Sequence, residues 1–188
     1  MAMPGATTAL NATEFDQPHW KIIAQGLDTE KWFNEGQGAG TGGILMPQPT
    51  RVPAGHYYYR FASSASPKSA QLGGGWWIDF ENFTVISRFA QSNGYRLREA
   101  ARLMLALPYD WSKVDLLVKA LLRSPLRAYT GEGKPAQGGI KGADRGTRWI
   151  PTQHIKVRQL YIPGLYVTGR TEQIYQKAFQ QPAEVTKL

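Results

Sequence analysis

The sequence predicts a single compact α/β (α+β) domain in which a small mixed sheet packs with helices. Its 188 residues, of which 42% are hydrophobic and 12% aromatic, are enough to bury one core and argue against a disordered chain. Aromatic segments with period-2 alternation predict strands, and segments with apolar residues three and four apart predict helices. No internal repeat or shift in composition marks a boundary. We therefore expect residues 1–188 to form one domain, with residues 1–11 as a flexible arm.

The composition excludes several classes of protein. Without cysteine the chain has no disulfide, no Cys-ligated zinc and no thiol nucleophile. The first 20 residues contain neither Lys, Arg nor an apolar run, which predicts no secretory signal. No stretch reaches the roughly 18 apolar residues that a membrane span needs. We therefore expect a cytoplasmic protein without a transmembrane segment.

The basic charge is concentrated in one third of the chain. Residues 96–158 contain 13 Lys or Arg and 5 Asp or Glu, so this region alone accounts for the net charge of +8. Such a concentration is typical of a surface that binds a polyanion, which predicts DNA or a nucleotide as the partner. The candidate DNA-binding residues lie in and after a glycine-rich segment of this region: Lys134, Lys141, Arg145, Arg148, Lys156 and Arg158.

Three segments of the first half have a less specific pattern. Residues 13–33 fit a helix or a short strand equally well. The glycine-rich residues 36–43 contain Gly-x-Gly-x-x-Gly, but prolines follow where a dinucleotide-binding fingerprint needs a helix, so we expect a loop. Residues 84–90 fit a helix capped by Asp79 or Asn82, and they also suit a strand.

Two aromatic segments, residues 56–61 and 76–80, predict strands. Alternation divides the first segment between two faces, Tyr57, Tyr59 and Phe61 against His56, Tyr58 and Arg60. In the second segment Trp76 and Trp77 point to opposite faces. At most one of these two indoles is therefore expected to be fully buried.

An arginine-rich helix behind Gly94 is the main candidate site. Its apolar residues face the core at helical spacing, which places Arg98 and Arg102 on the solvent side. A cationic first turn directly behind a glycine corner is a suitable seat for a phosphate, so Gly94, Arg98 and Arg102 are candidate phosphate- or nucleotide-binding residues. Glu99 is the candidate catalytic acid or base, because adjacent cations keep it ionised, with Arg96 beside it.

The basic region continues with a predicted helix and strand. Residues 112–122 predict a helix, because Ser112 and Asp115 resemble a capping box and the apolar residues behind them recur at helical spacing. Residues 126–129 predict a short strand.

The last third is expected to hold the longest strand of the chain. Residues 131–148 predict a long basic loop, a kind of segment that is often functional. Residues 149–150 and 154–162 predict the long strand, and Thr171 is placed to cap a last short helix.

A pair of carboxylates suggests a metal site. Asp79 and Glu81 share a face if they lie on a strand, where they would hold Mg²⁺ against a phosphodiester. The histidines His19, His56 and His154 are far apart in sequence and follow no zinc-ligand spacing.

The run from Gly94 to Ala101 resembles the glycine-then-arginine helix start of the ParB/sulfiredoxin superfamily. Residues 76–107, with the size, charge and absence of cysteine, resemble the plasmid fertility inhibition factors (Osa-like). This resemblance implies a ParB/sulfiredoxin-like fold with ATP as cofactor and a DNase or ATPase activity that blocks conjugative DNA export by type IV secretion. It implies phosphate binding by Gly94, Arg96 and Arg98, with Glu99 near the chemistry. The implied partners are DNA or a DNA–relaxase complex and a component of the secretion machinery.

Two alternatives remain. Tyr58-Tyr59-Arg60 and the run from Gln159 to Gly164 resemble the first and last strand motifs of mono-ADP-ribosyltransferases, including toxins and effectors. That resemblance implies an NAD site at Arg60 and Gln159, although Gln159 stands where the family has a catalytic Glu. The other alternative is a non-catalytic inhibitor that binds a secretion-machinery protein through its basic face.

Overall fold

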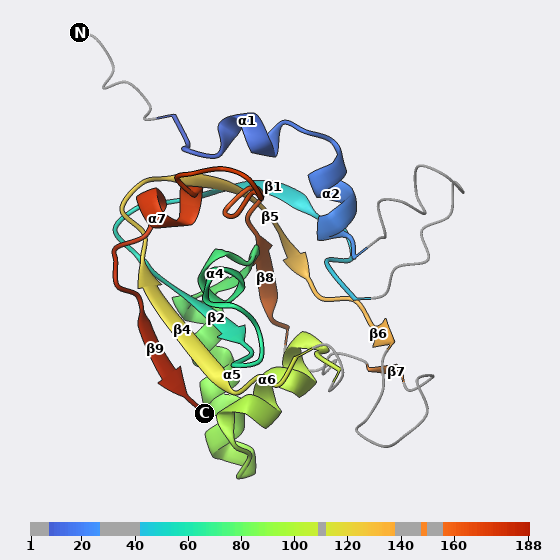
Figure 1. Cartoon of the computed structure of the whole chain (residues 1–188). Helices are drawn as coiled ribbons and strands as arrows, with labels where there is room; N and C mark the ends of the chain where they lie inside the picture. Colours follow the sequence, from blue (N-terminus) through green and yellow to red (C-terminus); the bar gives the residue numbers. More distant parts are fainter. Residues whose placement is uncertain (1–7, 27–41, 109–111, 138–147, 150–155) are drawn as a thin grey trace, which may run out of the picture.

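The computed structural model describes residues 8–26, 42–108, 112–137, 148–149 and 156–188. They form an α+β fold around one seven-stranded sheet with the order β1-β5-β8-β3-β2-β4-β9 (Figure 1). The predicted class is confirmed, but the prediction of a mixed sheet is wrong, because every strand pair in the described residues is antiparallel. The strands of the large sheet are β1 (Gln48–Val52), β2 (Tyr57–Ala62), β3 (Trp76–Asp79), β4 (Leu116–Leu121), β5 (Leu126–Glu132), β8 (Arg158–Tyr161) and β9 (Glu184–Lys187). A separate two-stranded ribbon consists of β6 (Ala136–Gln137) and β7 (Arg148–Trp149).

Helices cover both faces of the sheet. They are α1 (Ala12–Phe15), α2 (His19–Ala24), α4 (Lys68–Gly73), α5 (Phe80–Asn93), α6 (Leu97–Leu105) and α7 (Ile174–Ala178). The face that carries Tyr58 packs against α4 and α7, and the face that carries Tyr59 packs against α5 and α6. The predicted alternation of this strand is therefore confirmed, and Trp77 is buried while Trp76 is partly exposed. Among the described helices none is long and apolar enough to cross a membrane.

Of the two options left open for residues 84–90, the structure has the helix, and the glycine corner at Gly94 is confirmed. The Asp79 carboxylate accepts the backbone N–H of Asn82 at 2.8 Å and so caps α5, which is a helix throughout. Gly94 ends this helix with a left-handed φ of 68°, a conformation that glycine adopts without cost. The next helix, α6, starts three residues later, and the Glu99 carboxylate accepts the backbone N–H of Arg96 at its first turn.

The helix predicted over residues 112–122 is wrong. Val114 has a φ of 50°, its N–H is bonded to the Ser112 hydroxyl, and the chain then enters β4. This strand lies between β2 and β9, with Val118 and Ala120 buried on one face and the partly buried Leu117 packing toward α5 and α6 on the other. A run with apolar residues on both faces fits a helical stripe as well as a strand, so spacing alone misassigned it.

The prediction that residues 1–11 form a flexible arm is wrong for Asn11, the last residue of that range. Asn11 is fully buried, and its amide donates to the backbone carbonyls of Arg127 at 2.8 Å and Pro163 at 3.0 Å. Asn11 also accepts the N–H of Arg127, so this one side chain ties the N-terminal segment to strand β5 and to the turn after β8. Residues 1–7 lie outside the described residues.

Other predicted boundaries shift. The described part of residues 13–33 is helical, in α1 and α2, and residues 27–33 lie outside the description. In the described part of the predicted long strand, residues 156–162, the strand is β8; residues 154–155 lie outside the described residues. The longest described strand is the seven-residue β5, which extends into the predicted loop at residues 131–148. The last helix starts after Gln173, which takes the capping position predicted for Thr171.

Candidate functional site

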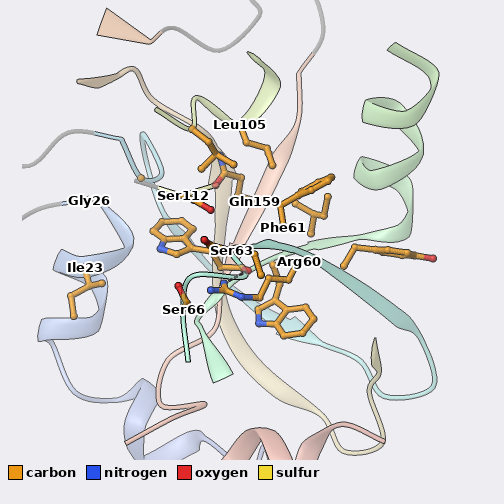
Figure 2. A pocket seen from close by; sticks show the side chains of 16 residues that line it. Ile23, Gly26, Arg60, Phe61, Ser63, Ser66, Leu105, Ser112 and Gln159 are labelled. Carbon is orange, nitrogen blue, oxygen red and sulfur yellow. Dashed lines mark hydrogen bonds between the residues drawn. The ribbon is translucent and has the colours of Figure 1, made fainter. Parts of the chain in front are cut away.

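The sheet splits between β2 and β3. These strands pair at only two positions, Tyr58 with Asp79 and Tyr59 with Ile78, after which β2 follows β4 and β3 follows β8. A cavity of about 400 Å³ opens beside this divergence, within the range of small-molecule sites. We call it the split-strand cavity (Figure 2). Its lining comes from β2, β3, Gln159 of β8, the end of α6 and neighbouring loops.

Arg60 fills the divergence between the two strands. Its guanidinium donates to the carbonyls of Gln71 at 3.0 Å, Trp76 at 2.8 Å and Ala70 at 3.3 Å. Nη1 and Nη2 each carry a further N–H, for which the described residues offer no acceptor. Burial lowers the pKa of Arg60 to about 10, so the side chain stays cationic at neutral pH.

Gln159 lies on another wall of the same cavity. Its side chain is only 9% exposed, and no hydrogen bond to its amide is found within the described part of the chain. Its amide is therefore available to hydrogen-bond a ligand that carries hydroxyl or amide groups.

The remaining lining is aromatic, aliphatic and hydroxylic. Trp76 is partly exposed and contributes indole surface, whereas the indole of Trp77 is buried against Phe179. Ser63 and Ser112 contribute hydroxyls whose oxygens accept from backbone N–H groups and whose O–H stays free to donate. None of the described lining residues is a carboxylate. The cavity therefore combines a fixed cation, hydrogen-bond donors and flat apolar walls, which suits an anionic ligand with a ring.

Comparisons with protein-family models, curated proteins and solved structures find no match. The chemistry of the site therefore rests on the geometry of this chain.

The arginine helix is arranged differently from its prediction. Arg102 is 5% exposed and does not face solvent; it donates to the carbonyls of Leu107, Pro108, Ser112 and Lys113. A guanidinium so engaged holds the chain that follows α6 in place. The remaining candidates stay near the surface, with Arg96 exposed, Arg98 and Glu99 partly exposed, and Gly94 at the corner.

The predicted carboxylate pair does not share a strand face. Asp79 ends β3 and Glu81 belongs to the first turn of α5, and Oδ1 of Asp79 already accepts from Asn82. Both acids nevertheless line a second hollow of about 570 Å³, together with Arg158 and His56. We call this the polar hollow. The described residues contain no cluster of three or more side chains able to hold a metal ion.

The predicted DNA-binding residues are scattered. Lys156 is exposed and pairs with Glu132 at 2.8 Å, and Lys134 is partly buried, which lowers its pKa by desolvation. Lys141 and Arg145 lie outside the described residues, and only the backbone of Arg148 is described. Among the members whose side chains are described, Lys134, Lys156 and Arg158, only Arg158 lines one of the two cavities described above.

Sequence reasoning missed the serines of the split-strand cavity and the role of the Gly73–Gly75 run beside it. No pattern marks single serines. Three consecutive glycines directly before a strand are the signal that was available, because they indicate a close approach of another group to the backbone.

Proposed function

We propose that this chain binds a nucleotide of the NAD⁺ class in the split-strand cavity. The observation that carries the proposal is that Arg60 and Gln159, far apart in sequence, line one cavity. They are the two residues that resemble the NAD site of mono-ADP-ribosyltransferases. The free N–H groups of Arg60 suit a phosphate, because a planar guanidinium binds phosphate oxygens in pairs.

The rest of the cavity supports the same ligand. The partly exposed indole of Trp76 suits a nucleobase or nicotinamide ring, and the serine hydroxyls and the Gln159 amide suit ribose hydroxyls. An amide at position 159 carries no negative charge to stabilise an oxocarbenium ion. We therefore expect NAD⁺ to be bound and cleaved only slowly.

The test is calorimetric titration with NAD⁺ and with ADP-ribose. Arg60→Ala is expected to weaken both ligands at least tenfold, and Arg60→Lys less, because it keeps a cation in the cavity. Arg88→Ala, which removes an exposed arginine of α5, is the matched control and should leave affinity unchanged. Circular dichroism checks the fold of each variant. Equal affinity of wild type and Arg60→Ala, or no binding at all, contradicts the proposal.

A second proposal is the DNA-directed function, a fertility inhibition factor of ParB/sulfiredoxin-like fold that binds and cleaves DNA in conjugative transfer, with ATP and Mg²⁺ as cofactors. It is favoured by the polar hollow, which brings Asp79, Glu81 and Arg158 together. Carboxylates beside an arginine suit a phosphodiester and its metal ion.

Its test is incubation with single- and double-stranded DNA, with and without Mg²⁺ and ATP, read on a gel. Glu81→Gln should abolish cleavage and Arg158→Ala should weaken binding, while Lys187→Ala on the edge strand β9 should change neither. Steep loss of binding with salt indicates phosphate contacts. A salt-insensitive complex with a secretion-machinery protein would instead favour the non-catalytic inhibitor.

A further inference from the structure

Gly74 faces the guanidinium of Arg60. Its backbone has a φ of −66° and a ψ of 146°, angles that any residue adopts, so backbone freedom does not require glycine here. A Cβ at this position would overlap Cζ, Nη1 and Nη2 of Arg60. The glycine is therefore needed because it lacks a side chain.

The surrounding groups fix the guanidinium in the same place. The carbonyls of Ala70 and Gln71 belong to the last turns of α4, and the carbonyl of Trp76 belongs to the first residue of β3. Gly74 lies on the segment that joins these two elements, and its own carbonyl accepts the indole N–H of Trp77 at 2.7 Å. The segment thus contacts Arg60 with carbonyl oxygens and with one bare α-carbon.

We propose that Gly74 is a positioning residue for Arg60: it sets where the guanidinium stands in the split-strand cavity and thereby the affinity of the cavity for an anionic ligand. This inference rests on the proposed nucleotide binding. The physical cause is steric, because a methyl group at position 74 would overlap the guanidinium and push it from its carbonyl partners.

A double-mutant cycle tests the inference with Gly74→Ala, Arg60→Ala and the double variant. Melting temperature and affinity are measured for each, with NAD⁺ and inorganic pyrophosphate as ligands. Gly74→Ala alone should lower the melting temperature and weaken binding about tenfold. In the Arg60→Ala background the same change should alter neither quantity, because the group it displaces is gone.

Gly73→Ala is the matched control. Its Cβ would crowd Tyr166 and Tyr175 and not Arg60. It should lower the melting temperature equally in both backgrounds. Gly74→Ala combined with Arg60→Lys should recover stability, because the slimmer lysine makes room for the methyl group, without recovering the affinity of wild type.

The outcomes separate this inference from the proposed function. If wild type binds pyrophosphate but not NAD⁺, the proposed NAD⁺ ligand is wrong, and the double-mutant cycle measured with pyrophosphate still tests the role of Gly74. Additive effects of Gly74→Ala and Arg60→Ala on affinity overturn the positioning role. A wild type that binds neither ligand overturns both.

Discussion

Two arginines of this protein, Arg102 and Arg60, both donate hydrogen bonds to several backbone carbonyls, but their surroundings differ. Arg102 donates to four backbone carbonyls at the end of α6, and Arg60 donates to three between α4 and β3. The first is enclosed by the loop that it holds, whereas the second also borders a cavity. A buried arginine is therefore informative about ligands only when its surroundings leave donors and space on one side. The predictions below test whether this difference separates a structural from a ligand-binding role.

The largest effect is expected for Arg102→Ala. The variant leaves four carbonyls of Leu107, Pro108, Ser112 and Lys113 without this donor, and it should lower the free energy of unfolding by about 3–4 kcal/mol. Urea denaturation measures the change. Arg98→Ala, on the same helix but partly exposed, serves as control, and equal losses in the two variants would remove the distinction.

A gain of chemistry is expected for Gln159→Glu. The substitution places a carboxylate in the cavity that Arg60 also lines, and it should raise the release of nicotinamide from NAD⁺ by roughly 10²-fold. Chromatography of the nicotinamide released measures this activity. Gln159→Ala should bind NAD⁺ more weakly and release no more nicotinamide than wild type. Should the Glu variant bind NAD⁺ yet cleave it no faster, the cavity does not hold the ribose as proposed.

The smallest effect on stability is expected at the surface. Arg96→Ala with Arg98→Ala should change the free energy of unfolding by no more than about 0.5 kcal/mol for each residue. If the helix contacts DNA, affinity should fall for every DNA sequence. The negative slope of log affinity against log salt concentration should become less steep by about 1–2. Fluorescence anisotropy at several salt concentrations measures both quantities. An unchanged slope would leave these arginines without a phosphate contact.

Local signals predicted part of the fold. A cap at Asp79 and a glycine corner at Gly94 specify where α5 begins and ends, since both act within a few residues. The strand β4 was misassigned because its two faces are covered by elements distant in sequence, and no local pattern records them. The order of the strands in the sheet could not be predicted either, because seven antiparallel strands can be arranged in many ways.

The candidate site was predictable only through resemblance. Alternation placed Arg60 on a strand, but nothing in spacing or composition brings it to the cavity that Gln159 lines. The arginine helix illustrates the opposite case, because helical spacing put Arg102 outside while a later loop folds over it and supplies carbonyls. Long-range acceptors decide the role of a buried cation, and they are invisible in a local sequence window.

β3 pairs with each of its neighbours, β2 and β8, at only two positions, so these two junctions are the narrowest hydrogen-bonded links in the large sheet. The β2–β3 junction has β1, β5, β8 and β3 on one side and β2, β4 and β9 on the other. A short ladder opens more readily than a long one, so amide hydrogens at the two narrow links should exchange faster than those in the β2–β4 ladder, which pairs at six positions. Arg60 on β2 donates to the Trp76 carbonyl of β3, so its side chain adds one further link between these two strands. A ligand bound to both Arg60 and Gln159 would connect β2 with β8, and it should slow amide hydrogen exchange also in β3, which lies between them.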